Sequence, residues 1–229
     1  MSTDLEHNRT ARDAVLARVR QRLRKTGDRT GARATAAGIV AAQAHGPRVP
    51  IEGSLAERFA TRATDMASTI ESIADRAEIP MRVARYLDAL VLPPALEKQK
   101  SHAGVCWPEF ADLDWRGAGL DIEPRVTTGS DRLGITGCYC AIAETGTLVF
   151  LSGADTPTGT AILPDTHIAV ARADRVVSGM EEAFALIRRE RGSLPRAVNL
   201  ISGPSRTGDI EQTIVLGAHG PYRVHILGL

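Results

Sequence analysis

A single carboxylate stands between two short apolar runs near the middle of the chain. Glu144 closely precedes Thr147–Leu151, an apolar run that predicts a buried strand. Gly146 lets the backbone turn, or approach another group, where a Cβ would clash. Because a charge at the mouth of a core strand needs a partner, a ligand or a shifted pKa, Glu144 is a candidate functional residue. The alternative is a carboxylate that caps a helix or pins a loop. The neighbouring candidate binding residues are Thr145, Gly146 and Thr147.

A second polar group lies in the segment from Ser202 to Glu211, which follows another expected strand. A helix is predicted to open at about Asp209. Backbone N–H groups at a helix start, together with Ser205, Arg206 and Thr207, would suit a phosphate or a carboxylate. The segment has neither the ending of a P-loop nor the glycine pattern of a dinucleotide fold. In the alternative interpretation, Thr207 or Asp209 caps the helix and Arg206 pairs with a neighbouring acid.

His219 lies in the turn Gly217–Pro221, just before the last expected strand. A histidine in a tight, glycine-flanked turn either faces a ligand or serves as an ordinary hydrogen-bonding residue. His167 and His225 fall within strand patterns, and we expect them to be structural. The candidate catalytic residues are therefore Glu144, Asp209 and His219, and Gly220 joins the candidate binding residues.

Short apolar segments and one helix pattern must position these loops. Strands that alternate with helices predict an α/β fold with a mostly parallel sheet, in which ligands collect at the carboxyl ends of the strands. We expect the three polar loops to lie there. The segments are Gly104–Cys106 and Leu120–Ile122 as weaker strands, Thr147–Leu151, Thr166–Ala171, Arg175–Val177, Ala197–Ile201 and Arg223–Leu227 as strands, and Met180–Arg191 as a helix.

The first hundred residues carry helical patterns and no obvious strand. Residues 1–53 are expected to form a basic amphipathic helix over about Thr10–Lys25, followed by a flexible, extended arm. Residues 54–229 form the expected α/β domain. Two helices are predicted at its start, over Arg62–Arg76 and Met81–Leu92, with Pro93-Pro94 ending the second.

Composition narrows the class of protein. The chain has 229 residues, 43% of them hydrophobic, which suits one full core with an appendage. A net charge of +1 argues against nucleic-acid binding, and no apolar run approaches the ~20 residues of a membrane span. The polar N-terminus has no signal-peptide pattern, so we expect a cytoplasmic protein. The three cysteines, Cys106, Cys138 and Cys140, are fewer than an iron–sulfur cluster normally takes, so we expect no metal or cofactor in this chain.

Several motifs, taken in order over roughly residues 130–229, make the chain similar to the lactate utilisation protein C family, whose shared domain is the LUD domain. The matching segments are Gly134–Thr136, Ala141–Leu148, Leu163-Pro164, His167–Val170, Gly203–Glu211 and Gly217–Pro221. The resemblance implies a three-layer α/β/α domain related to the sugar-phosphate isomerase and CoA-transferase superfamily, with an N-terminal helical arm. It also implies a part in oxidising L-lactate to pyruvate, with iron–sulfur clusters carried by partner proteins.

Two functions remain open. In the first, the chain is a non-redox subunit that binds a small carboxylate, or organises its iron–sulfur partners, through Ser205, Arg206, Thr207 and His219. In the second, it is a stand-alone acyl-CoA or sugar-phosphate type enzyme with Glu144 as nucleophile or general base, because Glu144-Thr145-Gly146 is similar to the Glu-x-Gly of CoA transferases. The sequence leaves open whether the chain forms a homo-oligomer.

Overall fold

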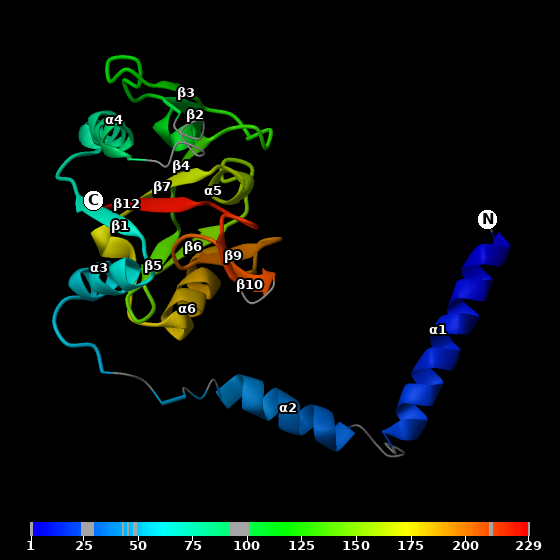
Figure 1. The fold of residues 1–229 in the computed structure, drawn as a ribbon. Coiled ribbons are helices and arrows are strands. Elements are labelled where there is room, and N and C mark those ends of the chain that lie inside the picture. The colour runs from blue at the N-terminus through cyan, green and yellow to red at the C-terminus, as the bar shows by residue number, and fades with distance from the viewer. Residues whose placement is uncertain are drawn as a thin grey trace. The chain divides into compact units, whose positions relative to one another are not determined.

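The computed structural model describes residues 2–23, 30–42, 44, 46–47, 50–91, 101–210 and 213–228. The chain divides into two compact units, Met1–Arg48 and Val49–Leu229. The first unit contains the helices α1 (Ser2–Arg22) and α2 (Thr30–Ala42), so a second helix occupies part of the segment that was expected to be an extended arm (Figure 1). No described helix is both long and apolar enough to cross a membrane.

A six-stranded sheet forms the centre of the second unit. Its strand order is β1-β12-β7-β4-β2-β3, and every neighbouring pair is parallel. Buried valine, isoleucine and leucine side chains fill it on both faces, as is typical of parallel sheets. The expected α/β fold with a mostly parallel sheet is confirmed. The strands are β1 (Thr69–Ser72), β2 (Ala103–Cys106), β3 (Asp121–Glu123), β4 (Leu133–Gly137), β7 (Thr166–Ala171) and β12 (Arg223–Gly228).

The direction in which strands are added reverses inside this sheet. From β2 the chain steps outward to the edge strand β3, and it then returns to the other side of β2 as β4. From β4 it continues through β7 to β12, away from β3. The reversal point therefore lies between β2 and β4, and a crevice forms at the carboxyl ends of strands at such points.

Different layers cover the two faces of the sheet (Figure 1). On one face, α4 (Ile79–Ala89) packs through a buried apolar stripe, and its Tyr86 stacks on His225 with 4.0 Å between ring centroids. His167 is in register with Val224, so it points to the opposite face from His225. There its ring contacts the ring of Phe150 in a second, smaller sheet, with 5.6 Å between ring centroids. The helix α3 (Leu55–Asp65) packs beside β1 and begins at a capping box formed by Ser54 and Glu57.

The second sheet has the strand order β8-β5-β6-β9, with antiparallel β5–β6 and β6–β9 pairs. Its side chains alternate: Leu148 and Phe150 join the main core, whereas Val149 and Leu151 pack against α6 (Met180–Arg191). The strands are β5 (Cys140–Ile142), β6 (Thr147–Leu151), β8 (Val176–Val177) and β9 (Val198–Ile201). The short helix α5 (Gly159–Ile162) crosses so close to β4 that a Cβ at Gly134 would clash with the Thr160 carbonyl oxygen.

Two predictions of local structure are wrong. The helix expected over Arg62–Arg76 is replaced by α3, which ends at Asp65, and by β1; Ala67, with a φ of 62°, separates the two. The helix expected to open at Asp209 is replaced by the antiparallel hairpin of β10 (Arg206–Ile210) and β11 (Thr213–Leu216). The β-branched run in β11 favours a strand and supplies the pairing partner. The expected stop at Pro93-Pro94 lies outside the described residues.

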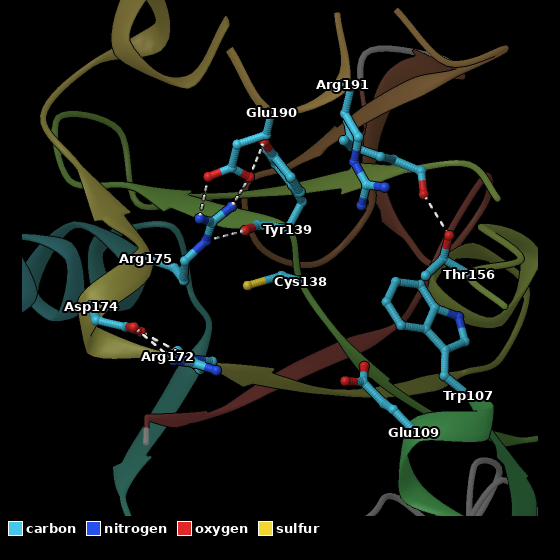
Figure 2. Close-up of a pocket in the computed structure, with 11 residues that line it drawn as sticks. Trp107, Glu109, Cys138, Tyr139, Thr156, Arg172, Asp174, Arg175, Glu190 and Arg191 are labelled. Atoms are coloured by element: carbon cyan, nitrogen blue, oxygen red, sulfur yellow. Dashed lines mark hydrogen bonds and ion pairs between the residues drawn. The ribbon is translucent and has the colours of Figure 1, made fainter. Parts of the chain in front are cut away.

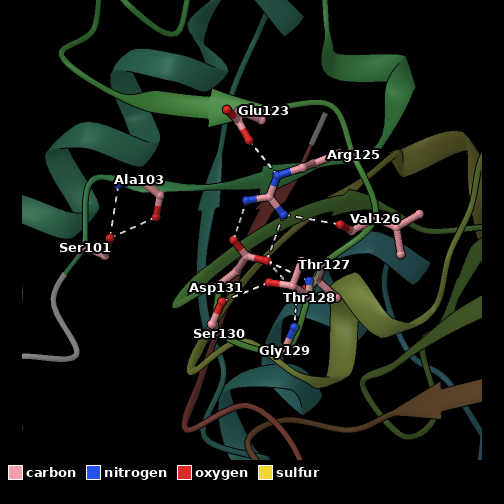
Figure 3. Close-up of polar contacts among 10 residues, drawn as sticks. All are labelled: Ser101, Ala103, Glu123, Arg125, Val126, Thr127, Thr128, Gly129, Ser130 and Asp131. Carbon is pink, nitrogen blue, oxygen red and sulfur yellow. Dashed lines mark hydrogen bonds and ion pairs between the residues drawn. The ribbon is translucent and has the colours of Figure 1, made fainter.

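A polar cluster anchors the loop that enters β4 (Figure 3). The Asp131 carboxylate accepts hydrogen bonds from Arg125 Nη2 at 2.8 Å, Thr127 Oγ1 at 2.8 Å and the Thr128 backbone N–H at 3.0 Å. Hydrogen bonding to Arg125 is the main reason that the pKa of Asp131 is held well below its ordinary value. The cluster therefore connects the segment that follows β3 to the segment that enters β4.

Candidate functional site

Glu144 lies beside the N-terminus of α6. Its backbone N–H donates to the Ser178 carbonyl at 3.0 Å. One of its carboxylate oxygens is 3.2 Å from where a Cβ on Gly179, the residue before α6, would stand. The N-terminus of a helix favours negative charge, and Glu144 lies there together with the carboxylates of Glu181 and Glu182. The placement corresponds to a helix-terminus role for Glu144, and Glu144 does not line the groove formed by the other two polar loops.

Gly146 makes a close backbone approach to α3. Its φ is +66°, and a Cβ there would stand 2.8 Å from Ala63 Cα and closer still to the Arg62–Ala63 peptide. The close contact that the sequence indicated at Gly146 is therefore made with another part of the same domain.

Hydroxyl groups link the Glu144 loop to the second polar loop. Thr145 Oγ1 lies 2.6 Å from Thr147 Oγ1, which in turn lies 2.7 Å from Ser202 Oγ. Thr147 is buried and Ser202 is exposed. Thr145 and Thr147 therefore use their hydroxyls within this chain of contacts, which ends at the edge of the groove that Ser202 lines.

The second and third polar loops come together at one groove of about 370 Å³. The Ser205 N–H donates to the Pro221 carbonyl at 2.9 Å, and the Gly217 N–H donates to the Ser205 carbonyl at 3.0 Å. Ser205, Arg206, His219 and Gly220, four of the residues singled out from the sequence, line this groove.

Hydrogen-bond donors dominate the groove. Arg206 and His219 are exposed, and within the described part of the chain Arg206 has no acidic partner. Asn199 also lines the groove, and its buried amide nitrogen has no hydrogen-bond partner among the described residues. A guanidinium, an amide N–H and a hydroxyl that converge on one cavity suit a carboxylate or phosphate ligand.

Thr207 does not join this set. It belongs to β10, as does Asp209; Thr207 pairs with Val215 and points away from the face that carries Arg206. The side chain of Asp209 lies outside the described residues. Since β10 replaces the expected helix, helix-end N–H groups do not contribute to the groove.

The groove also lies at a different end of the sheet from the one expected. The Gly217–Pro221 loop leads into β12, and the Tyr222 N–H donates at 2.8 Å to Asp165, which directly precedes β7. Because β12 and β7 are parallel, this loop is at the amino ends of the strands. The expectation that all three polar loops lie at the carboxyl ends is wrong.

The two strand histidines are structural, as expected. His167 is fully buried and its Nε2 lies 2.8 Å from Thr136 Oγ1, while burial lowers its pKa to about 3. His225 Nδ1 lies 2.8 Å from Thr69 Oγ1, and burial lowers its pKa to about 4. Both rings are neutral in the folded chain at neutral pH.

A second cavity, of about 440 Å³, lies at the carboxyl ends of β2, β4 and β7 (Figure 2). Trp107, Cys138 and Arg172, which directly follow these three strands, all line it. None of them was a candidate from the sequence, although Arg172 directly follows a correctly predicted strand. Its position directly after that strand is the signal in the sequence that indicates it.

The family model described as the LUD domain matches residues 58–227. This match agrees with the family expected from the motifs. Lactate utilization protein C of Bacillus subtilis (strain 168) is 36% identical over 121 residues, which cover 51% of this chain and 50% of that protein. Lactate utilization protein C of Deinococcus radiodurans is 34% identical over 154 residues, which cover 62% of this chain and 70% of that protein. The match spans about half the length of the Bacillus relatives.

A solved structure shares the fold. The crystal structure of a DUF162 family protein from Deinococcus radiodurans superposes with a TM-score of 0.52 and covers 76% of this chain and 95% of that one, at 23% sequence identity.

Proposed function

The chain belongs to the LUD domain family, and on that premise we propose that it is a non-iron–sulfur component of an L-lactate utilisation system that binds a small carboxylate in the groove lined by Arg206. The relatives that bear the name lactate utilization protein C support the system. The proposed ligand rests on one observation: Ser205, Arg206 and His219, which come from two loops, all line one groove.

The groove matches the chemistry of a hydroxy or keto acid. Arg206 can hold a carboxylate through two parallel N–H donors, and it has no competing acid among the described residues. Asn199 offers a donor that lacks a partner, and His219 and Ser205 can bond a hydroxyl or keto oxygen. Because Arg206 is exposed, its contact with a carboxylate contributes about 1 kcal/mol, and we expect weak binding, with a Kd of about 1 mM.

Electron transfer is assigned to partners in this proposal. The chain has three cysteines, and an iron–sulfur cluster normally takes four thiolates. Burial raises the pKa of Cys106 and Cys140 to about 11, and that of Cys138 beyond the usual thiol range, so the three thiols stay protonated at neutral pH. Iron–sulfur lactate utilisation proteins would accept the electrons while this subunit holds the substrate or organises the assembly.

The stand-alone enzyme with Glu144 as nucleophile has less support. Glu144 lies at the start of α6, separated from Arg206 by the Thr145–Thr147–Ser202 hydroxyl contacts. Glu144 is not one of the described residues that line the groove with the donors that would bind an acyl or phosphate group.

Titration calorimetry with L-lactate and pyruvate tests the proposal. We expect saturable binding by the wild-type chain. Arg206→Met should lose affinity by about fivefold or more, because the contact of about 1 kcal/mol corresponds to a factor of about five when 1.4 kcal/mol is a factor of ten. Arg116→Met, which removes another exposed arginine away from the groove, is the matched control and should bind as the wild type does. Retention of iron–sulfur proteins from the same lactate-grown cells on the tagged chain tests the assembly.

A further inference from the structure

The cavity at the carboxyl ends of β2, β4 and β7 occupies the point where strand order reverses. Trp107 follows β2 and Cys138 follows β4, so the cavity opens between the two strands that flank the reversal. Tyr139, which directly precedes β5, and the end of α6 lie on its other side (Figure 2). Leu151, the last residue of β6, also lines the cavity. Open parallel sheets bind ligands at such crevices. The groove lined by Arg206 is a separate cavity with different residues.

Ion pairs fix one wall of this cavity. Arg175 Nη1 and Nη2 bind the Glu190 carboxylate at 2.7 and 2.9 Å, and the Tyr139 hydroxyl donates to Glu190 at 2.7 Å. Arg172 binds Asp174 at 2.6 and 2.9 Å. These contacts hold Tyr139, which lies half-buried beneath the Arg175 guanidinium at 4.9 Å. The charges of Arg172 and Arg175 are therefore balanced by their own acids.

Arg191 is the cation of the cavity that has no such balance. Among the described residues it has no acidic partner, and it lies over the Tyr139 ring at 5.7 Å. Figure 2 shows its guanidinium projecting from the end of α6 into the space between Tyr139 and Trp107. An exposed guanidinium held over an aromatic ring keeps its hydrogen-bond donors available for an anion.

Glu109 projects from the segment after β2 toward the same cavity (Figure 2). Its carboxylate lies against the carboxyl end of β4, so close that a Cβ on Gly137 would clash with it. Loss of hydration raises the pKa of this carboxyl, and the Gly137 backbone and the Arg76 charge partly oppose the rise. Glu109 can therefore accept a hydrogen bond from a ligand, or donate one when protonated.

The size of the cavity indicates the size of the ligand. Its volume of about 440 Å³ corresponds to about fifteen water molecules of liquid volume and falls within the range of pockets for cofactor-sized ligands. An occupant of that size can reach both Arg191 and the Glu109 side while contacting the apolar surface of Trp107 and Leu151.

We propose that this cavity is a second binding site, for an organic anion larger than lactate, whose phosphate or carboxylate group is bound by Arg191 and whose hydrogen-bonding body faces Glu109 and Tyr139. A phosphate and a carboxylate would both bind through the guanidinium of Arg191, which has no acidic partner among the described residues. The site is distinct from the proposed lactate groove and does not depend on it.

Tryptophan fluorescence and calorimetry test the site directly. Trp107 lines the cavity and Trp115 is the chain's other tryptophan, buried in the core with its indole N–H bonded to Phe110. The probes are inorganic phosphate, citrate, glucose 6-phosphate and CoA, which separate small from large anions and phosphate from carboxylate. We expect at least one organic probe to change Trp107 emission saturably and to bind more tightly than inorganic phosphate.

Two variants decide whether the binding is at this site. Arg191→Met should weaken it by about tenfold. Arg188→Met, an exposed arginine one turn earlier on α6 that does not line the cavity, should leave it unchanged. Binding of no organic probe by the folded wild-type chain, or equal losses in both variants, would overturn the proposal. Arg206→Met should leave this binding intact, so failure of the lactate groove and failure of this site are distinguishable.

Discussion

Replacing Gly146 by alanine should destabilise the domain strongly, because two separate costs meet at this position. Its φ of +66° lies in the left-handed region, where a residue with a Cβ costs about 1–2 kcal/mol. The new Cβ would also stand 2.8 Å from Ala63 Cα and against the backbone of α3, and relieving such overpacking costs about 1–3 kcal/mol. Together these predict a loss of about 2–5 kcal/mol in the free energy of unfolding.

Gly119→Ala is the matched control for this prediction. Gly119 has a φ of +76°, but apart from its chain neighbours no heavy atom of the described residues lies within 4 Å of where its Cβ would be, so it carries the backbone cost alone. Urea unfolding of the two variants and the wild-type chain, followed by circular dichroism, should place Gly146→Ala well below Gly119→Ala. Equal losses in the two variants would refute the close contact with α3. A stable Gly146→Ala chain that loses only ligand binding would return Gly146 to a ligand-facing role.

Three further perturbations test other parts of the structure. Asp131→Asn should cost about 1–3 kcal/mol at pH 7, because it weakens hydrogen bonds to a charged group, and Asp155→Asn, an exposed aspartate, should cost little. The pKa of Asp131 is lower in the folded chain than in the unfolded chain. Its contribution to the free energy of unfolding is therefore present above the unfolded pKa of about 3.9 and is lost as the pH falls below that value. The urea midpoints of Asp131→Asn and the wild-type chain should converge under acid conditions. His167 and His225 stay neutral in the folded chain to pKa values of about 3 and 4, whereas unfolded histidine takes up a proton near pH 6.5. The free energy of unfolding should therefore fall by up to about 1.4 kcal/mol per pH unit for each histidine below that pH, and an unchanged pH dependence in His225→Gln would contradict this. Glu109→Gln should keep the fold and should reduce any pH dependence of organic-anion binding in the cavity that Arg191 lines. Calorimetry between pH 5 and 8 measures this. An unaltered pH dependence would exclude Glu109 from the binding.

Helices and strands with a clear apolar pattern over a few neighbouring residues were predicted correctly from the sequence. The continuous apolar run Thr166–Ala171 and the amphipathic run Met180–Arg191 form β7 and α6 with the expected bounds. The fold class followed from the alternation of such segments. β1 was missed because Thr69–Ser72 has one apolar residue and is stabilised by parallel pairing with β12, more than 150 positions away in the chain. No window of neighbouring residues contains that information.

The candidate site was predicted only in part, because its assembly also depends on contacts between segments that are far apart in the sequence. The motif around Ser205 and the turn around His219 were each visible in the sequence, and their meeting in one groove depends on the Ser205–Pro221 and Gly217–Ser205 backbone contacts. The segregation of Glu144 to the start of α6 depends on how the second sheet packs, which the sequence pattern does not contain. The cavity containing Arg191 and Glu109 is assembled from residues on several separate segments, none of which forms a motif alone.

The most direct test of the central claim is calorimetric titration of the isolated chain with L-lactate and pyruvate, comparing Arg206→Met with Arg116→Met. The account predicts saturable, millimolar-range binding by the wild-type chain and the Arg116 variant, with a fivefold or greater loss in the Arg206 variant. Binding that survives Arg206→Met unchanged, or no binding of either acid to the folded wild-type chain, would contradict it.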